Sequence, residues 1–541
     1  MKPLLIAVNA KYIHTNNAVR LLKANSAFQV EYMEFTIKDS LEYITETILH
    51  ATPTLLGFST YIWNVEMIKA IVLELRKSLD IPIILGGPEV SYDAEHFLRH
   101  WPIDGVVKGE GERVFDSIIA YYHNLKPLDI NHNFASYNND YPIREIEDLS
   151  SLKSPHFEVS DLPAFPHRIH YLESSRGCPY QCSYCLSSLE KKVRFFPLDS
   201  VLNNLNYLIK HGATTIKFLD RTFNANRSML AIIDAIIKNH RKGQSYQFEI
   251  TADRLDETII DYIHKHSPKK LFRFEVGIQS THSLTNQLVD RHQNHQILFN
   301  TLQKIIDGDI IDLHLDLIAG LPKENLARFK ETFNTVYQLG AKELQLGFLK
   351  MLRGTKIRLQ AARFGYQFQQ TAPYEITQHD DLSHADLTVI REVEQVLNVF
   401  HNKNLFNRLV YHHATRENAF DFFYQLSQHL KTRNVNLHRY QLDELYRHYE
   451  AFLTTKNLPI KSIDELRFLY LKRAKIKPKC YFPIVENKTQ KHACFEVIKD
   501  RHQLSINQLF KHSIVAYLFN QYHVFYYHDL TCKCYPIETV Q

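Results

Sequence analysis

The sequence lacks any uninterrupted apolar stretch long enough to cross a bilayer, so no membrane-spanning helix is expected. The apolar run at residues 3–6 soon meets Asn9 and Lys11 and is too short for a signal peptide. We also find no heptad pattern, tandem repeat or low-complexity tract. Hydrophobic residues make up 45% of the 541 positions and charged residues 23%, which is typical of a globular chain with three or four domains.

Cysteine and excess charge are both scarce. Seven cysteines in so long a chain, three of them clustered, argue against a disulfide framework, and we expect a reducing cytoplasm. The 64 basic and 59 acidic residues leave a formal net charge of only +5. Such a charge requires neither a nucleic acid nor a membrane surface as partner, so neither is predicted.

The three clustered cysteines are the most informative residues present. Cys178, Cys182 and Cys185 have the spacing Cys-x3-Cys-x2-Cys. Soft thiolates on one loop suit a [4Fe–4S] cluster, and three ligands for four irons leave one iron open for chemistry. The alternative is a zinc loop, which usually has a paired Cys or His at a set distance. No such pair follows closely here.

Residues 1–125 alternate strands with helices, which predicts a parallel sheet covered on both faces. Apolar strand segments occur at residues 4–8, 30–35, 55–59, 82–85 and 105–108. Small residues follow several of these strands, including Ser59, Thr60, Gly86 and Gly87. Ligands of such sheets bind at the carboxyl ends of the strands, although tight turns alone would also use these residues.

A second strand-and-helix rhythm runs about six times through residues 166–365. Its strand segments are 215–219, 246–250, 272–278, 314–318 and 344–348. Polar residues occur at or near their ends: Asp220, Glu249, Arg254, Gln279, Ser280 and Asp316. Barrel enzymes keep their chemistry at the carboxyl ends of the strands, whereas any one of these residues alone could be a cap or turn residue.

The remaining segments are a proline-broken linker, a helical region and a β-like end. We assign the linker to residues 126–165, the helical region to 366–479 and the small β-rich end to 480–541. The four remaining cysteines are Cys480, Cys494, Cys532 and Cys534. Their irregular gaps favour buried thiols over an auxiliary cluster or a zinc site, and their role is left open.

The run from residue 177 to 185 resembles the signature of the radical S-adenosylmethionine (SAM) enzymes. The resemblance implies that Cys178, Cys182 and Cys185 hold the cluster and are the catalytic metal ligands. It also implies that the open iron binds the amino and carboxylate groups of SAM, which an electron then cleaves to a 5′-deoxyadenosyl radical. Tyr184, the aromatic residue before the last cysteine, fits the same pattern.

Residues 166–365 resemble the partial (β/α)6 barrel of that family. The implied SAM-binding residues are Tyr184, Asp220, Glu249, Arg254, Gln279, Ser280, Asp316 and Gly320. Many members carry a Gly-Gly-Glu run for the amino group of SAM where residues 220–224 read Asp-Arg-Thr-Phe-Asn. The residue that binds this amino group is therefore left open.

Residues 1–125 resemble the Rossmann-like, doubly wound cobalamin-binding domain that precedes many radical SAM barrels. The matching runs are 57–60, 86–88 and 104–112. The implied cobalamin-binding residues are His14, Ser59, Thr60, Gly86, Gly87, Pro88, Gly109, Glu110, Gly111 and Glu112. Of the Asp-x-His-x-x-Gly motif of many cobalamin domains only His14 remains, so it is either a cobalt ligand or a hydrogen-bonding loop residue.

The runs 351–355 and 372–375 resemble an uncharacterised C-terminal extension (DUF4080-like) of one cobalamin-linked radical SAM subfamily. We therefore expect a cobalamin-dependent radical SAM enzyme that methylates an unactivated carbon, with a flavodoxin or ferredoxin as electron donor. Rearrangement or cyclisation without methyl transfer is the alternative. A tRNA methylthiotransferase is disfavoured because no cysteine precedes Cys178, and a cobalamin or redox sensor because the cysteine loop is intact. The substrate and the oligomeric state are left open.

Overall fold

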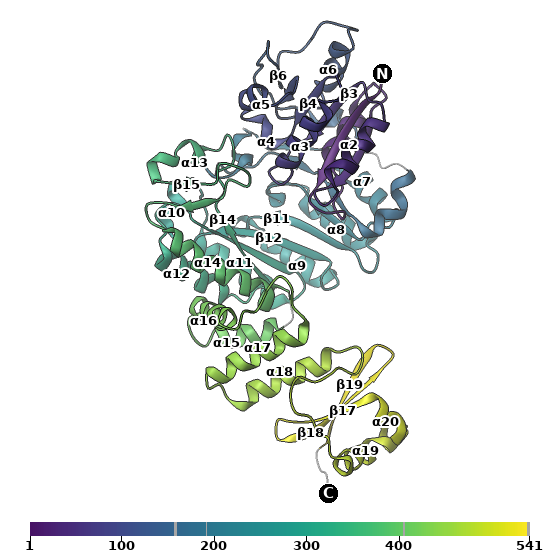
Figure 1. Ribbon diagram of the computed structural model, residues 1–541, viewed down its shortest axis with the longest axis vertical. Coiled ribbons are helices and arrows are strands. Elements are labelled where there is room, and N and C mark those ends of the chain that lie inside the picture. Colours follow the sequence, from purple (N-terminus) through teal and green to yellow (C-terminus); the bar gives the residue numbers. More distant parts are fainter. Residues whose placement is uncertain (156–158, 191, 404–405, 538–541) are drawn as a thin grey trace. The chain divides into compact units, whose positions relative to one another are not determined.

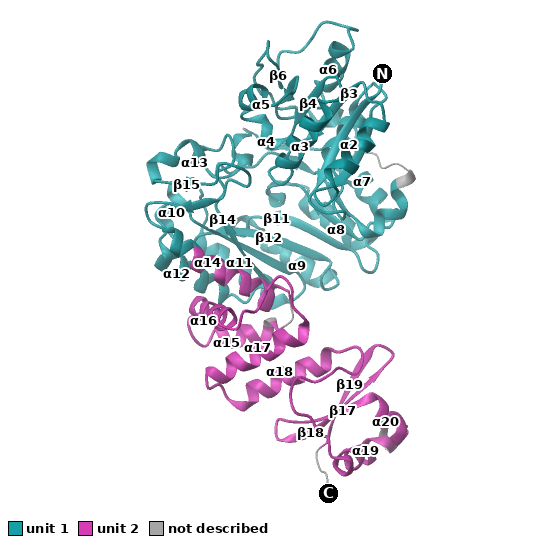
Figure 2. Cartoon of the chain, viewed as in Figure 1, with its two compact units in different colours: residues 1–387 teal, residues 388–541 magenta. Residues whose placement is uncertain are grey.

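The computed structural model describes residues 1–155, 159–190, 192–403 and 406–537 (Figure 1). It divides into two compact units, residues 1–387 and residues 388–541 (Figure 2). No helix in the described ranges has both the length and the apolar character to cross a membrane.

The first unit begins with a six-stranded sheet of order β2-β1-β3-β4-β5-β6. Its strands are β1 (Pro3–Asn9), β2 (Glu31–Thr36), β3 (Leu55–Ser59), β4 (Ile83–Gly86), β5 (Gly105–Val107) and β6 (Phe134–Ala135). All pair in parallel except β6, which runs antiparallel to β5. The expected doubly wound sheet is thus present, and the segment expected to be linker contributes its edge strand.

Helices cover both faces of this sheet because the apolar side chains of β1 alternate between two hydrophobic cores. Leu4, Ile6 and Val8 pack with α2 (Leu41–His50), α3 (Val65–Leu75) and α5 (Ala94–His100). Leu5 and Ala7 pack on the other face with α1 (Asn17–Asn25) and α6 (Phe115–Tyr122). A strand buried on both faces is apolar at successive positions, which explains why β1 was recognisable as an apolar run.

A second six-stranded sheet forms the partial barrel, in the order β14-β13-β12-β11-β10-β7, with every strand parallel. Its strands are β7 (Ile169–Leu172), β10 (Thr215–Phe218), β11 (Ser245–Ile250), β12 (Phe272–Gln279), β13 (Asp312–Ala319) and β14 (Glu343–Phe348). The accompanying helices are α7 (Leu198–Lys210), α8 (Met229–Asn239), α9 (Glu257–His266), α10 (Ser283–Leu288), α11 (His295–Gly308) and α12 (Leu326–Tyr337). Alternate residues of β12 and β13 are buried, and the intervening polar residues face the other side of the sheet.

Shorter elements connect and flank the two sheets of the first unit. The short strands are β8 (Ser175–Arg176), β9 (Arg194–Phe195), β15 (Gln367–Phe368) and β16 (Ile376–Gln378), and the short α-helices are α4 (Pro88–Ser91) and α13 (Lys356–Leu359). The 3-10 helices are η1 (Leu149–Ser151), η2 (Val159–His167), η3 (Leu186–Leu189), η4 (Phe223–Ala225), η5 (Ala252–Arg254) and η6 (Ala361–Phe364). The antiparallel pair β8–β9 brackets the cysteine loop.

The second unit is helical and ends in an antiparallel sheet of order β17-β18-β19. Its helices are α14 (His384–Leu397, which begins in the first unit), η7 (Asn398–Asn402, a π-helix), α15 (Asn407–Ala414), α16 (Ala419–Lys431), α17 (Leu442–Thr455), α18 (Ile460–Arg473), α19 (Lys488–His502) and α20 (Ile506–His512). The strands are β17 (Ser513–Leu518), β18 (Gln521–His528) and β19 (Thr531–Ile537). The expected β-rich end therefore starts with two helices. The sequence pattern did not indicate α19 because its buried face has only a few apolar residues, among them Cys494, Phe495 and Ile498.

A glycine substitution tests the turn between β4 and α4. Gly87 has φ +111°, and a Cβ atom there would lie 2.5 Å from the carbonyl oxygen of Thr60. We expect Gly87→Ala to lower the free energy of unfolding by about 2–5 kcal/mol, through backbone strain and overpacking. Gly243 is the control because it has φ +90° but no neighbour within 4 Å, so Gly243→Ala carries only the backbone strain of about 1–2 kcal/mol. Equal losses in urea denaturation would contradict the predicted steric contact.

Candidate functional site

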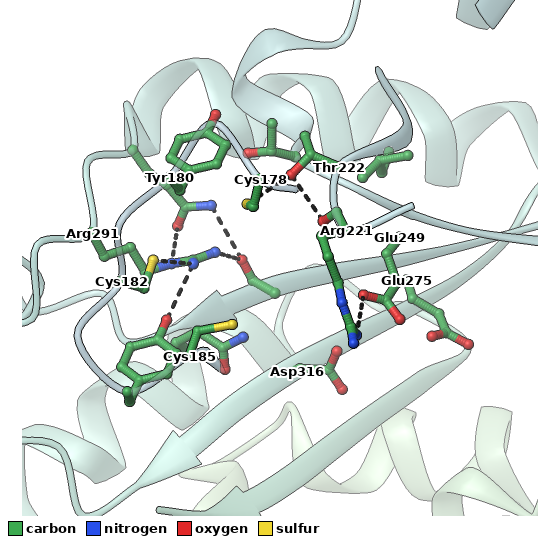
Figure 3. A pocket seen from close by; sticks show the side chains of 16 residues that line it. Cys178, Tyr180, Cys182, Cys185, Arg221, Thr222, Glu249, Glu275, Arg291 and Asp316 are labelled. Atoms are coloured by element: carbon green, nitrogen blue, oxygen red, sulfur yellow. Dashed lines mark hydrogen bonds and ion pairs between the residues drawn. The ribbon is translucent and has the colours of Figure 1, made fainter. Parts of the chain in front are cut away.

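The three clustered cysteines line one cavity of about 290 Å³ in the partial barrel (Figure 3). All three are free thiols, and they come from the single loop between β8 and η3. The rest of the wall is mostly polar. It consists of Tyr180, Tyr184, Arg221, Thr222, Glu249, Ile250, Thr251, Glu275, Gly277, Gln279, Arg291, Gln293 and Asp316.

Arg291 lies directly against the cysteine loop. Its Nη1 donates to the Sγ of Cys182 at 3.4 Å and to the hydroxyl of Tyr184 at 3.2 Å, and its Nη2 donates to the carbonyl of Gly277. Arg291 therefore ties the cysteine loop to Gly277 on β12. Burial raises the pKa of the Cys178 thiol, and a contact of 3.5 Å with the Thr222 hydroxyl partly offsets that effect.

The arrangement of the thiols fits an iron–sulfur cluster better than a zinc ion. A zinc site requires its ligands to converge on one atom, whereas each cysteine of a cluster binds a different iron. Within the described ranges, no three His, Cys, Asp or Glu side chains converge closely enough to hold a single ion. Three free thiols spread over the wall of one polar cavity are what a cluster needs.

The residues predicted to bind SAM fall into three groups by their position relative to the cavity. Tyr184, Glu249, Gln279 and Asp316 line the cavity together with the cysteines (Figure 3). Arg254 lies next to the cavity wall, with its guanidinium 5.3 Å from the centre of the Tyr180 ring. Asp220, Ser280 and Gly320 do not line it.

Asp220 is a buried support for the cysteine loop. Its carboxylate accepts hydrogen bonds from the backbone N–H of Ser174 at 3.0 Å and from the hydroxyls of Ser174 and Ser175 at 2.5 and 2.6 Å. It therefore fixes the end of β7 and the start of β8, just before the cysteines. Asp220 is only 1% exposed and does not form part of the cavity wall.

Ser280 and Gly320 are held by other parts of the barrel. The Ser280 hydroxyl is fully buried and donates to Glu324 at 2.5 Å. Gly320 has φ +94°, and its carbonyl accepts a hydrogen bond from the Tyr366 hydroxyl at 2.9 Å. Both residues shape the end of a strand rather than the cavity wall.

Several cavity residues were missed by sequence reasoning, including Arg221, Glu275 and Gln293. For Glu275 a signal was present, because Glu275, Gly277 and Gln279 alternate along β12 and share one face. This face also carries ion pairs that cross strands: Lys217 lies 2.7 Å from Glu275 and 3.7 Å from Glu249. The inner face of the barrel therefore carries charged side chains that form ion pairs across strands.

The predicted cobalamin loops lie at the carboxyl ends of β3, β4 and β5. The Thr60 hydroxyl after β3 is buried and has no hydrogen-bond partner within the described ranges. Gly86 ends β4, Gly87 begins the turn, and Pro88 is the first residue of α4. An unpaired buried hydroxyl and a turn without room for a Cβ atom fit a domain whose ligand approaches the backbone closely.

His14 bonds to the barrel. Its Nδ1 lies 2.6 Å from the hydroxyl of Tyr171 on β7, and the two rings stack with their centres 6.2 Å apart. Burial, reinforced by nearby Lys11 and Arg168, lowers the pKa of His14 and favours its neutral form. His14 thus makes a hydrogen bond to the barrel in this structure, and both of its predicted roles, as cobalt ligand or as hydrogen-bonding loop residue, stay predictions.

The run from Gly109 to Glu112, predicted to bind cobalamin, supplies ion pairs to the barrel. Arg176, the residue before the cysteine loop, lies 2.9 Å from Glu110 and 2.7 Å from Glu112. Arg194 on β9 lies 2.8 Å from Glu110. Burial raises the pKa of Glu110, but Arg176, the Ile146 N–H and Arg194 outweigh it and hold the pKa below its usual value. The N–H of Gly109 donates a hydrogen bond to the Ser91 hydroxyl at 2.9 Å, and the carbonyl of Gly111 accepts backbone hydrogen bonds at the start of α6.

The other four cysteines lie in the second unit. Cys494 is buried in the small core between α19 and the terminal sheet. Cys480, Cys532 and Cys534 are partly buried, and burial raises the pKa of each of these thiols. That these cysteines are buried thiols in place of an auxiliary cluster or a zinc site stays a prediction.

A doubly wound domain joined to a partial barrel with three thiols on one loop defines the class of the radical SAM proteins that carry a cobalamin-binding domain. Three family models match the chain in this order: "B12 binding domain" at residues 3–119, "Radical SAM superfamily" at 172–336 and "Protein of unknown function (DUF4080)" at 362–529. The chain therefore carries a B12-binding domain, a radical SAM domain and a DUF4080 domain in this order. The predicted family is confirmed, as is the predicted cofactor set of a [4Fe–4S] cluster, SAM and cobalamin at the level of these domains.

Two of the curated relatives match part of the chain. The "Uncharacterized methyltransferase PH0819" of Pyrococcus horikoshii is 29% identical over 205 residues, covering 35% of this chain and 44% of that protein. The "Cobalamin-dependent radical SAM methyltransferase TokK" of Streptomyces tokunonensis is 22% identical over 312 residues, covering 54% and 46%. The chain thus spans about half the length of the curated relatives it matches.

Two solved structures share the fold. The radical SAM methyltransferase TsrM from Kitasatospora setae, with cobalamin and a [4Fe–4S] cluster bound, has a TM-score of 0.58 at 14% identity, covering 69% of this chain and 78% of that one. The cobalamin-dependent SAM radical enzyme OxsB, with aqua-cobalamin bound, has a TM-score of 0.54 at 14% identity, covering 92% and 75%. At this level of identity the likeness concerns the fold, and it confirms the predicted architecture.

The buried carboxyl of Asp220 should make stability depend on pH. Burial raises its pKa to about 6 from 3.8, although hydrogen bonds from Ser174 and Ser175 oppose the shift. Between pH 4 and pH 6 the Asp220 carboxyl is protonated in the folded chain and ionised in the unfolded chain. Its contribution to the free energy of unfolding is therefore fully present below pH 4 and is lost as the pH rises through 6. The shift corresponds to about 3 kcal/mol.

We therefore expect the free energy of unfolding to fall less between pH 4 and pH 7 in Asp220→Asn than in the wild type, by about the contribution of Asp220. Asp256→Asn is the control because the exposed Asp256 carboxyl accepts hydrogen bonds from Thr258, which lower its pKa and give the opposite trend. Urea denaturation at both pH values measures the effect. An unchanged difference between wild type and Asp220→Asn at the two pH values would contradict the prediction.

Removing Arg176 should destabilise the junction of the two domains. Arg176→Ala would leave the partly buried carboxylates of Glu110, Glu112 and Glu173 without the cation that they share. We expect a loss of about 3–5 kcal/mol in the free energy of unfolding. Arg99 is the matched control, because its pair with Glu95 is exposed and should contribute about 0–1 kcal/mol. Similar losses for the two variants in chemical denaturation would refute the prediction.

Proposed function

We propose that this protein is a cobalamin-dependent radical SAM methyltransferase acting on an unactivated carbon. The observation that carries the proposal is the cavity in which three thiols of one loop face the polar strand ends of a radical SAM barrel. When bound, the cluster supplies the electron that cleaves SAM to a 5′-deoxyadenosyl radical, and cobalamin supplies the methyl group. The B12-binding domain and the similarity to named methyltransferases support methyl transfer.

The residues of this chain would bind and orient the reactants. Arg291 and Tyr184 hold one wall of the cavity, next to Cys182. Glu249 and Asp316 form part of the wall at the strand ends, where their carboxylates can accept hydrogen bonds from polar groups of SAM or substrate. Burial raises the pKa of Glu249, while Arg221 and Lys217 oppose this shift. Paired charges along the barrel thus favour a polar substrate over a purely apolar one.

Rearrangement or cyclisation is the second candidate, because it would use the same cavity and the same two domains. The structure of OxsB, a cobalamin-dependent SAM radical enzyme, covers 92% of this chain. A flavodoxin or ferredoxin would supply the electron in either case. We place the protein in the cytoplasm because its seven cysteines are free thiols and a reducing compartment keeps them so.

Anaerobic reconstitution with iron, sulfide and hydroxocobalamin, followed by incubation with SAM and a reductant, tests the proposal. Formation of both 5′-deoxyadenosine and S-adenosylhomocysteine supports methyl transfer. Deoxyadenosine without S-adenosylhomocysteine, in the presence of candidate substrates, would support rearrangement instead. Absence of deoxyadenosine from protein that carries a full cluster would overturn both proposals.

Cysteine variants separate a true cluster loop from incidental iron binding. We expect Cys178→Ala, Cys182→Ala and Cys185→Ala each to abolish the broad visible absorption of the cluster and the formation of 5′-deoxyadenosine. Cys494→Ala is the control, since this buried thiol lies in the core of the second unit. Iron content measured after desalting checks the result, and full iron retention in the three loop variants would contradict the assignment.

A further inference from the structure

A buried polar cluster joins the first turn of the B12-binding domain's α4 to the segment that follows the barrel. The carboxylate of Glu89 accepts hydrogen bonds from Nε of Arg353 at 3.2 Å and from the hydroxyl of Tyr374 at 2.5 Å. Arg353 Nε also donates to the Tyr374 hydroxyl at 3.1 Å, and its Nη1 pairs with Asp93. The Glu89 side chain is only 3% exposed. These bonds connect residues that are 264 and 285 positions apart.

Two aromatic rings lie against the guanidinium of Arg353. The guanidinium of Arg353 lies 5.2 Å from the centres of both the Phe97 and the Tyr374 rings. Arg358 covers the Tyr374 ring at 4.7 Å. A buried carboxylate is stable only when donors of fixed geometry satisfy it, and a planar guanidinium is well suited to that task. The directed hydrogen bonds of the cluster therefore hold Glu89 in one specific position, which a general charge attraction would not do.

The position of Glu89 affects two of the predicted cobalamin loops, those after β4 and β5. Glu89 lies in α4, which begins directly after the Gly86–Gly87 turn. Two residues further on, the Ser91 hydroxyl accepts a hydrogen bond from the N–H of Gly109 at 2.9 Å. The short helix α4 thus lies between the turn after β4 and the run that contains Glu110.

We propose that Arg353 and Tyr374 are positioning residues that act through Glu89 to hold α4, and with it the predicted cobalamin loops after β4 and β5, against the radical SAM domain. We call Glu89, Arg353 and Tyr374 the α4 clasp. Arg353 lies in the run 351–355, and Tyr374 lies in the part of the chain that matches the DUF4080 model. The clasp thereby gives the beginning of that domain of unknown function a role in the B12-binding domain.

Tyr374→Phe tests the clasp with the smallest change, because it removes only the hydroxyl that donates to Glu89. We expect amide hydrogen exchange in the full chain without cobalamin to become about tenfold faster in peptides covering residues 86–93 and 109–112. Hydroxocobalamin should also bind about tenfold more weakly. Arg353→Lys, which keeps the charge but loses the forked geometry, should give the same pattern.

Tyr366→Phe is the matched control, because Tyr366 is also buried and its hydroxyl donates a single bond of 2.9 Å to Gly320. This variant should leave exchange at residues 86–93 unchanged. Unchanged exchange at 86–93 in Tyr374→Phe, or a uniform increase throughout residues 1–387, would overturn the positioning role. The exchange measurement does not involve methyl transfer, so the α4 clasp and the proposed function can fail independently.

Discussion

Burial of the Arg176 guanidinium among carboxylates from two domains is the interaction on which the site depends. Glu110 and Glu112 come from the B12-binding domain, whereas Glu173 and Arg176 belong to the barrel. Each of these charges is costly to bury alone, so the group is favourable only when all partners are in place. Because Arg176 immediately precedes Gly177 and the cysteines, the position of the thiols depends on the neighbouring domain.

Two kinds of polar residue therefore surround the cavity. Tyr184, Glu249 and Asp316 face it and are available to ligands, whereas Asp220 and Ser280 are buried behind it and hold strand ends in place. These buried supports allow the cysteine loop to keep its shape although the loop itself has no regular secondary structure. The α4 clasp extends the same principle to the loops of the B12-binding domain.

Sequence reasoning recovered the features that depend on local pattern. The apolar runs located β1, β3 and β4 to within a residue or two, and the spacing of Cys178, Cys182 and Cys185 located the cavity. It could not distinguish cavity residues from supports, because Glu249 and Asp220 both lie at or just after strand ends and differ only in their tertiary partners. The pairing of Glu110 with Arg176 spans 66 residues and leaves no periodic trace in the sequence. The helix α19 was missed because its apolar residues are too few to show the period of a helix.

The large separation along the chain between Glu89 and its partners has a consequence for the order of events during synthesis. Arg353 and Tyr374 follow Glu89 by 264 and 285 residues. At about 5–20 residues per second, a ribosome makes them roughly 15–60 s after Glu89. During that interval the nascent B12-binding domain has its own sheet and both of its cores but no clasp. The clasp can therefore form only after the whole B12-binding domain and the barrel have been synthesised.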